Sequence, residues 1–169
     1  MGVVNTAAAS IRQEIPQKVK IMNITYRSAT SEDYQFTFEL KKVAEMDAIT
    51  AVFGWDEELQ QELHRQEWNS GLPTIICLDG KPIGTYLLES KHDTLFFSRF
   101  FILPAFQGMG IGSQILQTII KVSQQTHSPC KLCYRQGNRV GELYKRFGFI
   151  DYETDDVFVH MQFVPSFTN

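Results

Sequence analysis

Residues 101–116, FILPAFQGMGIGSQIL, constrain the fold of this chain more than any other segment. Gly108, Gly110 and Gly112 alternate here, between one apolar run and another. Alternating glycines weaken a helix or a strand that contains them, so they mark a break between two elements. The apolar spacing becomes helical from Ile111 onward. The segment is therefore predicted to be a buried strand that turns directly into a helix.

The start of the predicted helix is a candidate anion site. The first N–H groups of a helix have no partner within it, and the helix dipole is positive there. Because glycine has no side chain, a ligand can reach these N–H groups directly. Phosphate is the natural ligand, and a glycine turn that serves only tight packing is the alternative.

Two common phosphate-binding patterns do not fit the turn. A P-loop needs a lysine directly after its glycines, and none follows here. A dinucleotide fingerprint needs a third glycine and an acid about 20 residues further on. Ser113 stands in place of that glycine, and the first acid after the turn is Glu142. A P-loop nucleotidase and a Rossmann enzyme are therefore disfavoured.

Charge is distributed unevenly along the chain, although the net charge is only -3. Residues 1–93 contain 14 Asp and Glu but nine Lys and Arg, whereas residues 94–141 contain five Lys and Arg and no acid. The glycine turn lies in the basic part, which favours an anionic ligand there and a cationic ligand elsewhere. Ordinary scatter of surface charge is an equally good explanation. An isoelectric point of 5.8, without a basic aromatic stripe, argues against a nucleic-acid partner.

The chain of 169 residues is long enough for one domain with a substantial core and too short for two. We expect an N-terminal tail over residues 1–21, which lack periodicity, and a single domain over residues 22–169. The sequence predicts neither a membrane-spanning run nor a secretory signal. Three cysteines are few and odd in number, which favours the reducing cytoplasm. The CKLC segment lacks a second ligand pair at zinc spacing, so no metal site is predicted.

The pattern of apolar residues predicts the order β-α-α-β-β-β-α-β-α-β-β. The strand at residues 93–103 is apolar almost throughout and is expected to be central. Asp56 is expected to cap the second helix, and Ser31 or Asp33 the first. The order predicts an α/β (α+β) domain in which a mixed, mainly antiparallel sheet of about seven strands is flanked by about four helices. The strands are expected over residues 23–30, 74–90 (a hairpin that turns at 79–80), 93–103, 129–135, 149–153 and 157–164, and the helices over residues 36–46, 56–68, 113–125 and 139–147.

Two segments together resemble the GNAT superfamily of acyl-CoA-dependent N-acyltransferases. QGMGIG, residues 107–112, fits the family signature Q/R-x-x-G-x-G/A. NRVGELYKRFGF, residues 138–149, resembles the signature N-x-x-A-x-x-L-Y-x-x-x-G-F, with Gly141 where alanine is common. The order of elements also matches the family over most of the chain. The resemblance implies a GNAT-like fold, with two parallel central strands that splay apart beside the acetyl donor.

The resemblance also implies how acetyl-CoA would bind. Backbone N–H groups of the glycine turn would hold the pyrophosphate, and the end of the central strand would pair with the pantetheine amides. The strands that splay apart would be those at residues 93–102 and 129–135. Asn138 would contact the pantetheine arm, a role compatible with capping the fourth helix. The implied cofactor-binding residues are Phe101, Ile102, Gln107, Gly108, Met109, Gly110, Ile111, Gly112, Ser113 and Asn138.

Tyr144 occupies the family's tyrosine position and is the implied general acid for the leaving thiolate. A tyrosine that only packs on the sheet is the alternative. Many family members use a glutamate on the central strand to take the acceptor's proton, but residues 97–100 contain no carboxylate. Ser98 is therefore the candidate on this strand, as the residue that holds a catalytic water.

The segment FGWDEE borders the acceptor site in this family. Asp56 and Glu57 are candidates for binding a cationic amine, although capping the second helix explains them equally. Trp55 is a candidate to enclose the acceptor or, equally, to pack in the core. The four histidines show no ligand spacing and are expected to be structural or solvated.

The predicted function is transfer of an acetyl group from acetyl-CoA to an amine of a small molecule or peptide, by direct attack of the amine. The partners are then acetyl-CoA and an amine acceptor, with neither a nucleic acid nor a membrane, and a homodimer is compatible with such a fold. The alternative is a non-catalytic acyl-CoA-binding or sensing module, because cofactor motifs can persist without turnover.

Overall fold

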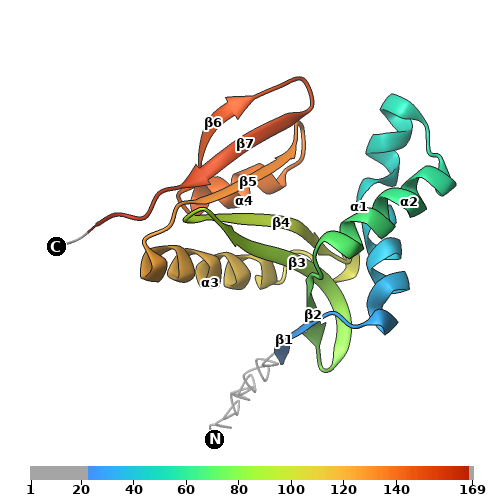
Figure 1. Cartoon of the computed structure of the whole chain (residues 1–169), viewed down its shortest axis with the longest axis horizontal. Coiled ribbons are helices and arrows are strands. Elements are labelled where there is room, and N and C mark those ends of the chain that lie inside the picture. Colours follow the sequence, from blue (N-terminus) through green and yellow to red (C-terminus); the bar gives the residue numbers. More distant parts are fainter. Residues whose placement is uncertain (1–22, 168–169) are drawn as a thin grey trace, which may run out of the picture.

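The computed structural model describes residues 23–167, so the expected tail over residues 1–21 lies outside the described residues (Figure 1). Within them, seven strands form one sheet in the order β1-β2-β3-β4-β5-β7-β6. Neighbouring strands are antiparallel except β4 and β5, which are parallel. The predicted α/β domain with a mainly antiparallel sheet is confirmed. The elements are β1 (Ile24–Ser28), η1 (Ser31–Asp33), α1 (Tyr34–Phe53), α2 (Glu57–Ser70), β2 (Thr74–Leu78), β3 (Lys81–Lys91), β4 (Thr94–Ile102), η2 (Pro104–Phe106), α3 (Ile111–Thr126), β5 (Cys130–Arg135), α4 (Val140–Arg146), β6 (Ile150–Thr154) and β7 (Phe158–Phe163).

The main core lies between α3 and the sheet. Ile115, Leu116 and Ile119 of α3 are almost fully buried, in one cluster with Phe97 of β4 and Met161 of β7. Their helical spacing gives α3 a single apolar face for the sheet. Figure 1 shows α3 along one side of the sheet, and α1 and α2 together at the end away from β6 and β7. This packing fixes the start of α3 relative to the central strand.

The start of the first helix is held differently from the prediction. Ser31 and Asp33 belong to the short η1 turn. Asp33 is the N-cap residue of α1, as predicted for one of the two, but its side chain accepts no hydrogen bond from α1. The Asp33 carboxylate instead accepts the N–H of Thr30 at 2.8 Å and two bonds from Arg27, at 2.7 and 2.9 Å. The hydrogen-bonded Arg27 guanidinium lowers the pKa of the buried Asp33 carboxyl to about 2. The pair ties the end of β1 to the beginning of α1.

α1 is also longer than expected, because it runs to Phe53 rather than to residue 46. Its apolar residues do not share one face, since Ile49 is buried while Val43 and Val52 are exposed. A helix without a single apolar stripe has no periodic pattern from which its end can be read. α1 stops at Gly54, whose φ of 73° favours glycine.

β4 is central, as its apolar sequence predicts, and it separates from β5 partway along. The two strands pair only at Leu95 with Cys130 and at Phe96 with Lys131. Beyond these pairs β4 continues to Ile102 without a partner on this side, whereas β5 stays paired with β7 as far as Arg135. Figure 1 shows the two strands diverging from their paired ends, so the expected splay is confirmed.

β4 also contains a bulge that its sequence does not indicate. Between its pairs at Ser98 and Phe101, β4 has two residues where β3 has one. One of them, Arg99, has a left-handed φ of 51°. Its guanidinium donates to the carbonyl of Gly71 at 2.7 Å and to the hydroxyl of Ser70, at the end of α2, at 3.1 Å. A tertiary contact therefore holds the bulge, and the bulge brings β4 and α2 together.

Candidate active site at the splayed strands

The glycine turn follows the end of β4 that has separated from β5. Gly108 and Gly110 have φ of 76° and 82°, and a Cβ built on either would find nothing within 4 Å. Residues 107–110 are exposed. The first N–H groups of α3 come directly after this open turn, at the positive end of the helix dipole. The shape and the free donors fit a phosphate group.

Gly112 differs from the other two glycines. It lies in the first turn of α3, where a Cβ would come within 3.1 Å of Leu143 Cδ2 and 3.4 Å of Phe100 Cζ. Because any side chain would be this close, glycine allows α3 to approach α4 and β4. Packing thus accounts for Gly112, whereas the open space around Gly108 and Gly110 leaves room for a ligand.

The contact between Gly112 and Leu143 brings α4, and with it Tyr144, beside the start of α3. Tyr144 is only 5% exposed and belongs to the main core cluster. Burial raises the pKa of its phenol, with smaller contributions from Cys133 and Tyr134. The phenol is therefore protonated at neutral pH, which is the state that a proton donor needs.

A second tyrosine lies beside Tyr144. Tyr134 of β5 is beyond the last pair with β4, and its ring centroid is 5.9 Å from that of Tyr144. Its ring fills the space that a Cβ on Gly141 would occupy. Sequence reasoning did not single out Tyr134, although glycine in place of the usual alanine at 141 was a signal that something large lies there.

Two polar side chains proposed for the site are accessible to solvent. Asn138 Oδ1 accepts the N–H of Val140 at 3.0 Å and so caps the first turn of α4. Its amide nitrogen donates to none of the residues that the structure describes, so it is available to a ligand. Ser98 is exposed on β4, just beyond the last pair with β5.

A small pocket lies where α1 and α2 meet β4, and its walls include Lys41, His64, Arg99 and Phe101. His64 is buried, with Nε2 3.1 Å from the hydroxyl of Thr37. Its Nδ1 has no hydrogen-bond partner among the described residues. Burial lowers the pKa of His64, which keeps the ring neutral and agrees with the structural role expected for it.

The residues predicted to bind the acceptor lie at the start of α2, where internal bonds engage them. Asp56 accepts the N–H of Leu59 at 3.0 Å, so it caps α2 as predicted. Glu57 accepts the indole N–H of Trp55 at 2.7 Å and lies 3.1 Å from Lys42 Nζ. These bonds lower the pKa of Glu57 and partly neutralise its charge.

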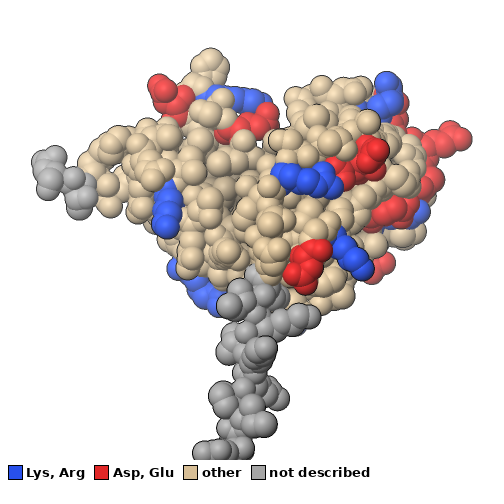
Figure 2. Space-filling view, turned by 90° about the horizontal axis from the view of Figure 1, so that it is seen from below, with Lys and Arg blue, Asp and Glu red and all other residues tan. Residues whose placement is uncertain are grey.

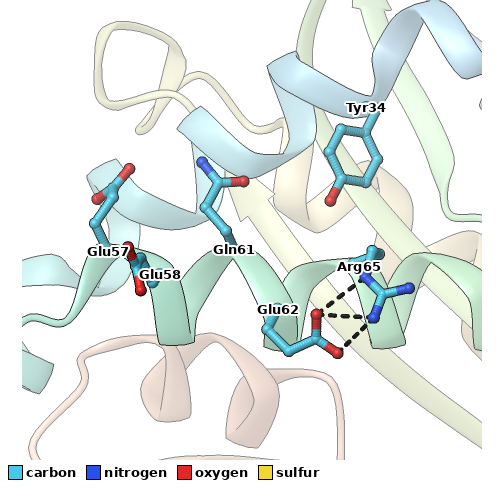
Figure 3. A pocket seen from close by; sticks show the side chains of 6 residues that line it. All are labelled: Tyr34, Glu57, Glu58, Gln61, Glu62 and Arg65. Atoms are coloured by element: carbon cyan, nitrogen blue, oxygen red, sulfur yellow. Dashed lines mark hydrogen bonds and ion pairs between the residues drawn. The ribbon is translucent and has the colours of Figure 1, made fainter.

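An open pocket of 390 Å³ lies beside these residues, and Figure 3 shows the side chains that line it. Three carboxylates line it, and Arg65 pairs with one of them, Glu62, at 2.6 Å. Figure 2 shows acidic side chains gathered at the end of the molecule that α1 and α2 occupy. The uneven charge of the sequence is therefore also uneven in space. The pocket is lined by Tyr34, Glu57, Glu58, Gln61, Glu62 and Arg65.

The described part of the chain contains neither a membrane-spanning helix nor a cluster of metal-ligating side chains. No helix within residues 23–167 is long and apolar enough to span a membrane. In the same range, no group of three or more His, Cys, Asp or Glu side chains is placed to hold a metal ion. The three cysteines are free thiols, and only Cys133 is exposed.

Solved structures share this fold at low sequence identity. PaiA N-acetyltransferase from Thermoplasma acidophilum, in complex with coenzyme A, is 20% identical with a TM-score of 0.66, covering 85% of this chain and 99% of that chain. Ard1 from Thermoplasma volcanium is 17% identical with a TM-score of 0.61, covering 85% and 98%. The ribosomal-protein-S18-alanine N-acetyltransferase from Escherichia coli is 17% identical with a TM-score of 0.61, covering 86% and 96%. No curated protein matches the chain significantly by sequence.

The likeness to these structures establishes the fold, and the sequence establishes the family. Residues 33–149 match the sequence model of the "Acetyltransferase (GNAT) family". This range contains the splayed strands, the glycine turn and all of α4. The molecule is therefore of the acyl-CoA-dependent acetyltransferase class, and the chain belongs to the GNAT acetyltransferase family.

Proposed function

We propose that the protein transfers an acetyl group from acetyl-CoA to an amine of a small molecule or peptide. The observation that carries the proposal is that the glycine turn follows directly on the unpaired half of β4, with Tyr144 alongside. The proposed donor site comprises Phe101, Ile102, residues 107–113 and Asn138. An extended pantetheine arm would pair with the free edge of β4, and the N–H groups before and within the first turn of α3 would hold the pyrophosphate.

Tyr144 is the proposed general acid. When the acceptor nitrogen attacks the thioester carbonyl, a C–N bond forms, the C–S bond breaks and negative charge develops on sulfur. A phenol that stays protonated can donate to that sulfur as the charge appears. Ser98, exposed on β4, is proposed to hold a water near the acceptor.

The acceptor is proposed to enter from the acidic end of the molecule, past Trp55, Asp56 and Glu57. Asp56 and Glu57 already form hydrogen bonds or ion pairs within the protein. They would therefore attract a cationic acceptor through their electrostatic field rather than bind it directly. Peptide α-amines belong among the candidate acceptors, because one structural relative is named for the alanine of a ribosomal protein.

A second candidate function is a non-catalytic acyl-CoA-binding or sensing module. It is favoured by the lack of a carboxylate at residues 97–100 of β4, where many family members have a catalytic glutamate. Both functions need the donor site, so only turnover distinguishes them.

Thiol release from acetyl-CoA tests the proposal. The wild-type chain is mixed with acetyl-CoA and, in turn, spermidine, lysine, kanamycin or an alanine-initiated peptide. We expect release that depends on one class of amine. Tight binding of acetyl-CoA without amine-dependent release from any of them would overturn the enzymatic function and favour the binding module.

A further inference from the structure

The small pocket between α1, α2 and β4 has a charge opposite to that of the surface around it. Its wall carries two cations, Lys41 and Arg99, and one anion, Glu67. His64 adds no charge, because burial lowers its pKa and keeps the ring neutral. The wall therefore has an excess of one positive charge, at the end of the molecule where acidic side chains gather (Figure 2).

Arg99 is the cation of this wall that has no carboxylate partner. Lys41 Nζ lies 2.8 Å from Glu67 Oε1, so these two charges compensate each other. The Arg99 guanidinium donates only to uncharged oxygens, the Gly71 carbonyl at 2.7 Å and the Ser70 hydroxyl at 3.1 Å. It forms no ion pair with any residue in the range 23–167. Because a guanidinium has about five N–H donors, some of those of Arg99 remain for a further acceptor.

The hydrogen bonds of Arg99 place its guanidinium at the pocket. The residues that accept them, Ser70 and Gly71, lie in the chain between Trp68 and Pro73, which both line the pocket. Arg99 is also half-buried, so its charge is only partly hydrated. The free donors of the guanidinium are therefore within reach of a group that enters the pocket.

The pocket has room for a small group beside the proposed donor site. Its volume of about 20 Å³ exceeds the roughly 10–15 Å³ that one water molecule needs, so it admits a group of a few atoms and not a ring. Phe101 belongs both to the wall of the pocket and to the proposed donor site. A group held in the pocket therefore lies next to the end of β4 with which the donor would pair.

We propose, on the basis of the function proposed above, that the acceptor is an amine that also carries a carboxylate, such as a free amino acid, and that Arg99 binds this carboxylate in the pocket. A guanidinium and a carboxylate can form two parallel hydrogen bonds. Partial burial makes their attraction stronger than it is in bulk water. The acidic surface outside the pocket attracts the ammonium group of the same molecule. Polyamines and aminoglycosides carry no carboxylate and would leave Arg99 without its partner.

The test compares amino acids with their amides, which lack the negative charge. Acetylation of glycine, alanine, methionine and lysine, each as free acid and as amide, is measured for wild type, Arg99→Gln and Lys121→Gln. We expect wild type to prefer the free acid by at least about tenfold in kcat/KM, the size expected for one hydrogen bond to a charged group. Arg99→Gln is expected to lose this preference. Lys121→Gln, which removes an exposed cation of α3, should keep it.

The ratio of kcat/KM for acid and amide separates binding of the carboxylate from a structural role of Arg99. Because Arg99 also holds the bulge of β4 against α2, its replacement is expected to slow the reaction with both members of a pair. Comparing the ratio between two proteins removes this common loss, together with the difference in reactivity between the two amines. Arg99→Lys keeps the positive charge and is expected to retain part of the preference. If the melting curve shows that Arg99→Gln does not fold, Lys41→Gln reduces the positive charge of the wall instead and should lower the preference.

The outcomes also separate this inference from the enzymatic function. A wild type without a preference for the free acid, or a folded variant with the wild-type ratio, would overturn the inference and leave the enzymatic function standing. Acetylation of spermidine or kanamycin but of no free amino acid would do the same. A wild type that acetylates no amine would overturn both.

Discussion

The ring of Tyr134 on β5 lies where Gly141 of α4 would place a Cβ. A methyl group built there would be 2.5 Å from Tyr134 Cζ and 2.9 Å from Cε2, closer than non-bonded atoms can approach. The family motif commonly has alanine at this position, so the glycine and the tyrosine form a matched pair. The pair also sets the packing of Tyr144, whose ring centroid is 5.9 Å from that of Tyr134.

The first prediction concerns this pair. Gly141→Ala is expected to destabilise the protein by about 1–3 kcal/mol, because the added methyl group overpacks the space against Tyr134. Combining it with Tyr134→Leu, which removes the obstructing ring atoms, should restore part of that loss. Urea unfolding of the two single variants and the double variant gives the coupling free energy between the two positions. If the losses in the free energy of unfolding are strictly additive, the two residues do not compete for the space.

The second prediction concerns Tyr144. Phenylalanine keeps the buried ring, so Tyr144→Phe is expected to retain its fold and its acetyl-CoA affinity. If the phenol protonates the leaving sulfur, kcat falls by at least about tenfold, and KM for the acceptor changes little. Steady-state kinetics beside a melting curve decide the matter. A loss of Tm with normal kcat would assign the tyrosine to packing alone.

The third prediction concerns the glycine turn. Saturating acetyl-CoA is expected to raise the Tm of wild type by about 5–10 °C. Gly110→Asp should abolish this increase, because it fills the open turn and adds a negative charge. Gly80→Asp is the matched control, since Gly80 has a similar φ of 80° and open surroundings in the β2–β3 turn. The control should lose stability alone and keep the full ligand-induced increase. If acetyl-CoA raises the Tm of all three proteins equally, the phosphate does not bind at the glycine turn.

The fourth prediction concerns acid stability. The folded-state pKa of Asp33 is lowered to about 2, so its pairing with Arg27 stabilises the protein above pH 4 and is lost as the pH falls toward 2. Asp33→Asn is expected to cost about 1–2 kcal/mol at pH 7, reduced from the full linkage value because Arg27 is partly solvated. The difference from wild type should vanish near pH 2. Chemical denaturation at several pH values measures it, and a difference that is independent of pH would exclude the ion pair as its cause.

Local rules were sufficient for much of this fold. Alternating apolar residues and a short turn predict the β2–β3 hairpin, and Asp56 before an acidic first turn predicts the start of α2. Where local rules failed, contacts remote in sequence decided the result. The bulge at Arg99 depends on Gly71 and Ser70, which no pattern within β4 can indicate.

The candidate site divides in the same way. The glycine turn and the position of Tyr144 follow from motifs, because a phosphate and a leaving sulfur need those residue types at those places. Tyr134 belongs to neither motif. Its packing against Gly141 and Tyr144 of α4, which is remote in sequence, places it beside the proposed general acid.

The early separation of β4 from β5 also bears on how the protein avoids aggregation. An unpaired strand normally lies at the rim of a sheet, where the strand of another molecule can join it. Here the unpaired edge of residues 97–102 lies within the sheet, with β5 and β7 continuing on the far side of the gap. A slender extended molecule can enter such a gap, but a foreign sheet cannot. The unpaired backbone N–H and C=O groups of β4 thus remain available to a ligand. They are shielded from the strands of other protein molecules, with which they could otherwise aggregate.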